Sequence, residues 1–232
     1  MKIVVSHLTR MEPGYVCVAG LDIRSGQHVR PVLGRRLSRD LLQTNGGVFD
    51  IGAVVDLGRT ASVGTAPEVE DHQFSVENLK LNGSMAAREF WTTLQNSSSP
   101  DFRTIFGPAL TARGGGCAVE MNTGTASLGC LQLPRGSVLE VDRYDKIRLR
   151  LNDGTFAPNL SVTDLRLYED DQKTPRQEVI ARLQNRTRNE NVLLSVGLAR
   201  AWKKPGDTDS RHWLQVNNLH FESDPLGQRV FR

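Results

Sequence analysis

A short run of alternating basic and apolar residues is the first feature of this sequence that could bind a charged ligand. Lys146, Arg148 and Arg150 occupy every second position. Because side chains alternate across a strand, these cations would share one face about 7 Å apart, comparable with the phosphate spacing along a nucleic-acid strand. The pattern predicts a nucleic-acid contact. It is also typical of a solvated sheet face, on which Glu140 and Asp142 of a neighbouring strand would pair with the cations.

The residues between these cations decide which way the cations point. Ile147, Leu149 and Leu151 are aliphatic and would occupy the buried face of the strand. Exposed arginines contribute little to folding. We therefore expect the double substitution Arg148→Ala and Arg150→Ala to weaken nucleic-acid binding without unfolding the protein.

Polar residues of the N-terminal block form a second candidate site. His7 and Arg10 precede the first turn, and Arg30 lies on a strand further along the chain. A hairpin could bring His7 or Arg10 close to Arg30, where they would bind a phosphate or a base edge. The same residues could instead form a structural network that closes a small barrel. Both interpretations stay open on the sequence alone.

The third candidate is the C-terminal strand, residues 211–221, which mixes polar and apolar side chains on both faces. Asn217 and Asn218 could read bases, because an amide both donates and accepts hydrogen bonds. Buried amides could equally satisfy irregular backbone. Trp213 or Trp202 would offer a stacking surface for a base if exposed, and would belong to the core if buried.

Motifs for catalysis or for a cofactor are absent from the sequence. The five histidines never occur at ligand spacing, and the three cysteines form no C-x-x-C pair. The glycine run at 113–116 is no Walker loop, because no Lys-Ser/Thr follows it. We therefore predict no catalytic residue, no metal ligand and no cofactor.

Composition narrows the class of protein. The chain has 232 residues, of which 38% are hydrophobic and 24% charged, and no apolar stretch is long enough to cross a membrane. With no signal-peptide core and only three cysteines, it is expected to be cytoplasmic. Of the 29 basic residues 23 are arginines, which suit phosphates and base edges; a GC-rich genome would produce the same bias.

Short strands separated by turn signals must position these candidates. Three strands before residue 33 have the spacing of an antiparallel meander. Helices are predicted over 85–95, capped by Ser84, and after Thr174, where Pro175 and Gln177 complete a capping box. The other expected strands cover 51–57, 68–76, 137–143, 145–151, 155–157, 160–168, 192–202 and 211–221, with a short helix at 38–43 and a surface tail from 224 to 232.

The polar loop at 96–100 and the glycine run at 113–116 divide the chain into two strand-rich halves. We predict a mainly β fold with a few helices, built as two OB-like small β-barrels in one compact unit. Residues 1–112 would form the first barrel with a helical insertion. Residues 113–232 would form the second, with one amphipathic helix.

Blocks near both ends of the chain carry a family resemblance. The sequence opens with KIVVSHLTRM, YVCVAGLD and VRPV, and LSVGLAR and HWLQVNNLH stand near its end. From about residue 2 to 221 it resembles the dual OB-containing domain family of prokaryotic proteins associated with nucleic-acid modification. The resemblance implies two OB-like barrels and a role tied to nucleic acid in prokaryotic genome conflict. The resemblance assigns no catalytic residue to this sequence.

These observations together predict a nucleic-acid-binding module. It would serve as an accessory or recognition subunit of a nucleic-acid-modification or anti-phage defence system, and would bind single-stranded DNA or RNA. One alternative is a protein-interaction subunit that binds a helicase or nuclease partner. An enzyme acting on nucleic acid is less favoured, because the motifs are missing. Arginine and aromatic residues sharing one exposed groove would favour the binding module.

Overall fold

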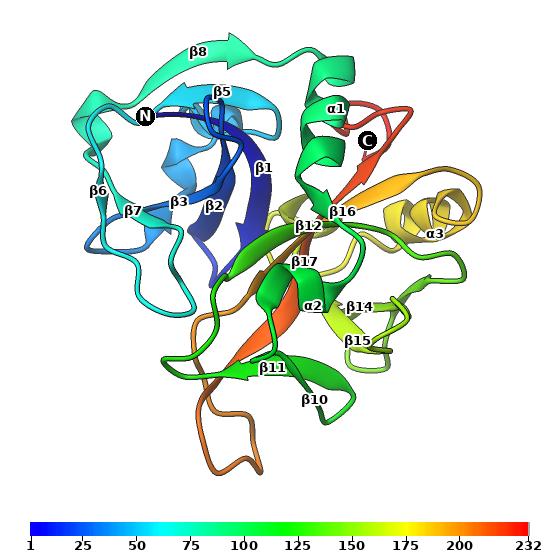
Figure 1. Ribbon diagram of the computed structural model, residues 1–232. Helices are drawn as coiled ribbons and strands as arrows, with labels where there is room; N and C mark the ends of the chain where they lie inside the picture. The colour runs from blue at the N-terminus through cyan, green and yellow to red at the C-terminus, as the bar shows by residue number, and fades with distance from the viewer. Residues whose placement is uncertain (232) are drawn as a thin grey trace.

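A computed structural model describes residues 1–231, and its first sheet begins with the expected meander (Figure 1). Strands β1, β2 and β3 pair antiparallel, and β3 then pairs parallel with β7. The order across this sheet is β6-β7-β3-β2-β1-β5-β8, with β4 beside β2. Its strands are β1 (Lys2–Arg10), β2 (Tyr15–Asp22), β3 (His28–Val32), β4 (Leu37–Ser38), β5 (Ala53–Asp56), β6 (Ala61–Ser62), β7 (Asp71–Gln73) and β8 (Lys80–Ser84).

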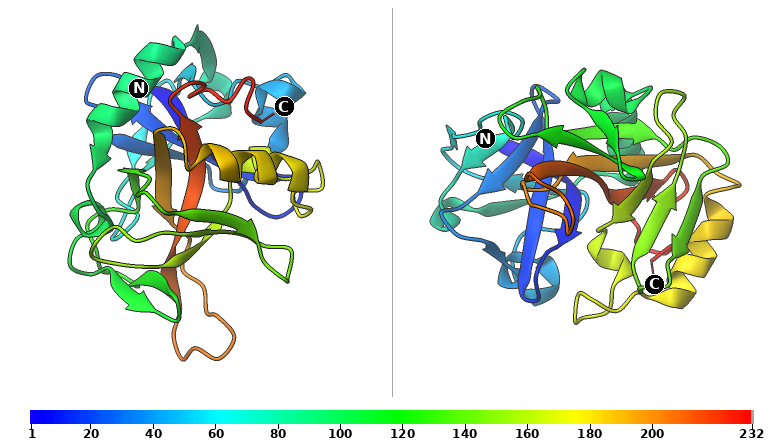
Figure 2. Two further views of the ribbon diagram at one scale, coloured as in Figure 1. Left: turned by 90° about the vertical axis from the view of Figure 1, so that its right-hand side faces the viewer. Right: turned by 90° about the horizontal axis from the view of Figure 1, so that it is seen from below.

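The second sheet has the order β13-β14-β15-β17-β16-β12-β9, and β11 joins it by pairing with β17 and β10. The long hairpin of β16 and β17 forms its centre (Figure 2). Its strands are β9 (Ser98–Ser99), β10 (Thr111–Arg113), β11 (Gly116–Glu120), β12 (Leu128–Gln132), β13 (Val138–Val141), β14 (Ile147–Arg150), β15 (Asn159–Val162), β16 (Val192–Leu198) and β17 (Arg211–Phe221).

Helices are few and short, as expected for a mainly β chain. The predicted stripe of α3, made of Val179, Ile180 and Leu183, is buried. The helix nevertheless starts after Arg176, because the Thr174 hydroxyl donates to Asp171 instead of capping the helix. The helices are α1 (Ala87–Ser97), α2 (Phe102–Phe106) and α3 (Gln177–Arg186), with 3-10 turns η1 (Arg39–Leu41), η2 (Gln43–Asn45), η3 (Val76–Asn78) and η4 (Leu165–Leu167).

Each sheet has its own hydrophobic core, and α1 connects the two. Phe90, Trp91 and Leu94 of this helix pack in the core of the first sheet, which also takes in Cys130 and Leu193 from the second. Large apolar side chains contribute about 1.5–3 kcal/mol each when fully buried. The shared cluster therefore holds the two β units together.

Several details differ from the expectations. Strand β9 already pairs in the second sheet and α2 packs in the second core, while the domain boundary at residue 112 stays a prediction. Residues 155–157 form no strand. The predicted surface tail is wrong for Val230 and Phe231, which are buried because the Asp224 carboxylate accepts backbone N–H groups of the tail and folds it back.

Two β units with short helices confirm the mainly β fold class. Across the residues described, the strand order of each sheet is an open path, so neither sheet closes into a complete barrel. In the same residues, no helix combines the length and the apolar character that crossing a bilayer requires.

Candidate nucleic-acid interface

The basic stripe lies on β14 with the predicted orientation. Ile147 and Leu149 are buried, whereas Arg148 is half-buried and Arg150 and Lys146 are exposed. Both arginines already have acidic partners on the side of β13. Arg148 Nε lies 2.9 Å from an Asp142 oxygen, and Arg150 Nε lies 3.2 Å from a Glu140 oxygen. Two of the three charges are therefore neutralised within the sheet, and the role of the stripe in binding stays a prediction.

The double substitution Arg148→Ala and Arg150→Ala is expected to leave the protein folded. Each ion pair is partly or fully exposed to water, where such pairs contribute about 0–1 kcal/mol. Thermal unfolding followed by circular dichroism should give a midpoint within a few degrees of the wild type. A loss of more than about 3 kcal/mol would show that the bond from Arg148 to Ser161, at 2.6 Å, organises the sheet.

Arg30 of the N-terminal block is buried in an ion-pair network between the two units. Its Nε donates to Asp71 at 2.5 Å, and the other Asp71 oxygen accepts from Arg200 of the second unit at 2.6 Å. Arg200 also pairs with Glu68 at 2.9 Å. Arg30 is only 4% exposed, so its guanidinium supports the inter-unit contact in this conformation.

His7 is also buried, and its hydrogen bond fixes its tautomer. The Asn217 amide nitrogen lies 3.0 Å from His7 Nδ1. Because that amide nitrogen only donates, Nδ1 accepts and the proton is on Nε2. Burial is the largest cause that holds the pKa of His7 well below its usual value. The neighbouring His28, His220 and Arg30 lower the pKa further. The ring is therefore neutral at pH 7.

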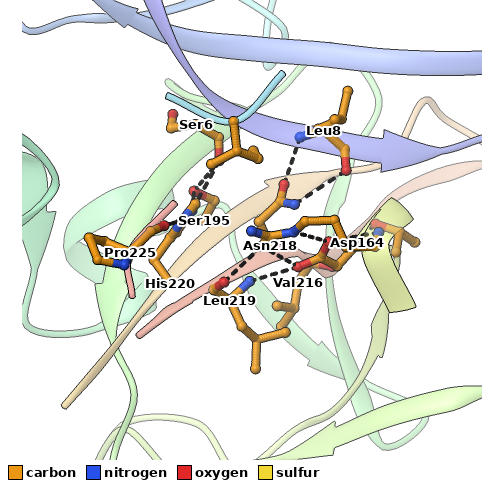
Figure 3. A network of polar contacts seen from close by, with 12 residues as sticks. Ser6, Leu8, Asp164, Ser195, Val216, Asn218, Leu219, His220 and Pro225 are labelled. Atoms are coloured by element: carbon orange, nitrogen blue, oxygen red, sulfur yellow. Dashed lines mark hydrogen bonds and ion pairs between the residues drawn. The ribbon is translucent and has the colours of Figure 1, made fainter. Parts of the chain in front are cut away.

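Asn218 clamps the two central strands together (Figure 3). Its side-chain oxygen accepts from the Leu8 amide at 2.6 Å, and its nitrogen donates to the Leu8 carbonyl at 3.3 Å. Beside this clamp both strands are bulged, β1 at Ser6 and β17 at Asn217. Strand β5 pairs with β1 only from Lys2 to Val4, so it offers no partner to the backbone of Leu8, and the Asn218 amide satisfies these groups as a neighbouring strand would.

A Ser–His pair lies on the other side of the clamp (Figure 3). Ser195 Oγ donates to the Ser6 carbonyl at 2.8 Å and lies 3.0 Å from His220 Nε2. His220 Nδ1 is 3.2 Å from the Pro225 carbonyl, and burial lowers its pKa to about 4. Both side chains are fully buried, so the pair joins the units and is inaccessible to a substrate.

Arg10 and Trp213 complete the predicted set, and both have partners within the protein. Arg10 donates to the Gln172 carbonyl at 3.0 Å, with its guanidinium 4.3 Å from the centre of the Tyr168 ring. Trp213 is 6% exposed and carries Lys204 over its ring. The five buried residues are therefore unavailable to a base in this conformation: His7, Arg30, Trp213, Asn217 and Asn218.

An exposed basic groove lies on the first unit, which the sequence reasoning missed. Two hollows of about 340 and 560 Å³ share Leu33, Arg35 and Arg36 in their linings. The smaller one, here called the inter-unit pocket, is also lined by Arg30 and, from the second unit, Arg200. The larger, here called the outer hollow, contains Tyr15, Pro13 and Gly14, together with one acidic residue, Asp40. Together these hollows form what we call the basic groove.

Side chains suited to a nucleic acid gather along this groove. Tyr15 is 38% exposed, and the Arg36 guanidinium lies 5.8 Å from the centre of its ring. Arg36 pairs with Glu12, whereas Arg35 is exposed and makes no hydrogen bond or ion pair with the rest of residues 1–231. The sequence signal was the Arg35-Arg36 pair after a strand, but their neighbours Tyr15 and Arg200 are distant in the chain.

Residues 1–231 form no metal centre. Among residues 1–231, no group of three or more His, Cys, Asp and Glu side chains could hold an ion. Burial raises the pKa of the Cys117 thiol to about 11 and that of Cys130 to about 12. These two thiols are therefore protonated at pH 7 and unreactive.

Comparison with known proteins connects this architecture to a family. The sequence profile of the dual OB-containing domain matches residues 1–219, from the first residue to the end region of β17. The chain belongs to the dual OB-containing domain family. This confirms the resemblance read from the two end blocks, and it identifies the two β units as OB-like. No curated protein matches the chain.

Because the first unit is OB-like, the position of the basic groove can be compared with the ligand-binding face of OB-folds. OB-folds bind oligonucleotides on the face of strands 2 and 3 and at the loop between strands 1 and 2. Here Val16 and Cys17 of β2, Val32 of β3 and Met11 of the β1–β2 loop all line the inter-unit pocket. The inter-unit pocket of this dual OB chain is therefore lined by the second and third strands of the first unit and by the loop between its first two strands.

Proposed function

We propose that this dual OB chain binds single-stranded DNA or RNA through its basic groove. The observation that carries the proposal is the position of Arg35, Arg36 and Tyr15 beside strands β2 and β3. Single-strand binders combine cations that follow the backbone with aromatic rings on which bases stack. The excess of arginine over lysine also supports this reading, because guanidinium groups suit phosphates and stack on bases.

In the cell the module would act as an accessory or recognition subunit. Chemistry on the bound nucleic acid would then come from a partner such as a helicase or nuclease. Such an arrangement suits a cytoplasmic nucleic-acid-modification or anti-phage defence system of prokaryotes. The stripe of Lys146, Arg148 and Arg150 would add a weaker, partly neutralised contact.

Salt dependence of binding tests the proposal. A protein that neutralises about three phosphates of a single strand should show a slope of roughly −2 in log K against log salt, at about 0.7 per contact. Fluorescence anisotropy of a labelled oligo-dT and of a labelled oligo-U, each titrated at several salt concentrations, measures that slope. The absence of binding at low salt to both strands would reject the proposal and favour the protein-interaction subunit.

A further inference from the structure

The inter-unit pocket has walls from both OB-like units, and four arginines line it. Arg30, Arg35 and Arg36 come from the first unit, and Arg200 comes from the loop after β16 of the second. Three of them have carboxylate partners: Asp71 and Glu68 bind Arg30 and Arg200, and Glu12 binds Arg36. Against three carboxylates, four arginines leave one positive charge, which is on Arg35. One phosphodiester group would neutralise it.

The rest of the pocket lining is apolar, which an anion alone does not require. Val16, Leu33 and Leu37 contribute to it, and the volume of about 340 Å³ lies in the range of small-molecule sites. A nucleotide offers both kinds of surface at once, because its base is flat and apolar on its faces while its phosphate is charged. The lining therefore fits one nucleotide better than a phosphate or a peptide carboxylate.

We propose that the inter-unit pocket holds a single nucleotide of the bound strand, with its base against the apolar lining and its phosphodiester on Arg35. This inference rests on the proposed function, and it adds the position along the basic groove at which one nucleotide is held. Because Arg200 belongs to the second unit and Arg30 to the first, the strand would contact both units at this point. A free nucleotide offers the same chemistry, so the test must separate the two sources.

Cys17 provides a reporter inside the pocket. It is half-buried and lines the pocket, whereas Cys117 and Cys130 are buried. The rate at which N-ethylmaleimide alkylates Cys17, followed by mass spectrometry of the peptides, reports whether the pocket is occupied. Oligo-dT at ten times its Kd should slow this rate about tenfold, in proportion to occupancy. Free dTMP at the same concentration should leave the rate unchanged.

A matched pair of variants provides an independent measurement. Arg35→Ala removes the unpaired charge of the pocket and should weaken oligo-dT binding about tenfold, as expected for a charge-assisted contact with phosphate. Arg24→Ala removes the same charge at an exposed position of the first unit that lies outside both hollows, and should change affinity less than twofold. Both residues are exposed, so both variants should fold.

The outcomes separate this inference from the proposed function. Oligo-dT that binds without protecting Cys17, while Arg35→Ala behaves like Arg24→Ala, would overturn the pocket and leave nucleic-acid binding intact. Protection by dTMP as strong as that by oligo-dT would identify a free nucleotide as the occupant and overturn the strand assignment. Failure of any oligonucleotide to bind would reject both. Where the Cys17 thiol reacts too slowly to follow, the ratio between the two variants decides alone.

Discussion

Acidification from pH 7 to pH 5 is expected to lower the free energy of unfolding by about 2 kcal/mol for each of His28 and His220. Burial lowers the pKa of both residues to about 4, against about 6.5 in the unfolded chain. The unfolded protein therefore binds protons at a pH at which the folded protein does not. The contribution of the two neutral histidines to the free energy of unfolding is fully present above about pH 6.5. It is lost as the pH falls from there to about 4.

Urea unfolding at pH 7, 6 and 5, followed by tryptophan fluorescence, measures this loss. The window above pH 5 isolates histidine, because ordinary carboxylates titrate below it. The slope of the free energy of unfolding against pH reports how many more protons the unfolded state binds than the folded state. His220→Gln should reduce that number by about one, whatever the substitution does to stability at pH 7. A free energy of unfolding that stays constant from pH 7 to pH 5 would contradict the presence of neutral His28 and His220 in the folded protein.

Asn218→Ala is expected to destabilise the protein by about 3 kcal/mol. The substitution leaves the Leu8 N–H and C=O without a partner at a buried position, and each unsatisfied group costs about 1–3 kcal/mol. Strands β1 and β17 then lose this contact between the two units. Denaturant unfolding checks the value, with Asn96→Ala, an exposed position of α1, as the matched control.

The control should change stability by less than about 0.5 kcal/mol, because surface substitutions away from such features have small effects. If Asn218→Ala is equally mild, the side chain does not hold the two units together. In that case the shared apolar cluster around α1 and the ion pairs of Arg30 and Arg200 with Asp71 would provide the connection.

Local patterns predicted the strands well and failed where distant segments meet. The bounds of β17 were predicted correctly, because a Pro-Gly loop precedes the strand. The tail from residue 224 was wrong because its burial depends on Asp224 and on the second core, which no local pattern reveals. The stripe on β14 could be placed on its face, and its acidic partners were anticipated, because adjacent strands form a short hairpin.

The candidate site shows the same division between near and distant contacts. Asn217 and Asn218 were selected correctly as polar residues needing partners, but those partners, His7 and Leu8, lie 210 residues away. Their residue types suggested base reading, whereas the fold uses them to join two units. The sequence did not predict the basic groove for a related reason, because Arg200 and Arg35 line one pocket only in the folded chain.

Affinity for single-stranded oligo-dT at low salt, compared between two double variants, tests whether the strand binds in the basic groove. Arg35→Ala with Arg36→Ala removes the two cations that line both hollows of the basic groove and should weaken binding at least about tenfold. Arg148→Ala with Arg150→Ala removes two cations that already pair with Asp142 and Glu140, and should weaken binding less than about threefold. The opposite order, or equal losses in both variants, would contradict a binding site in the basic groove.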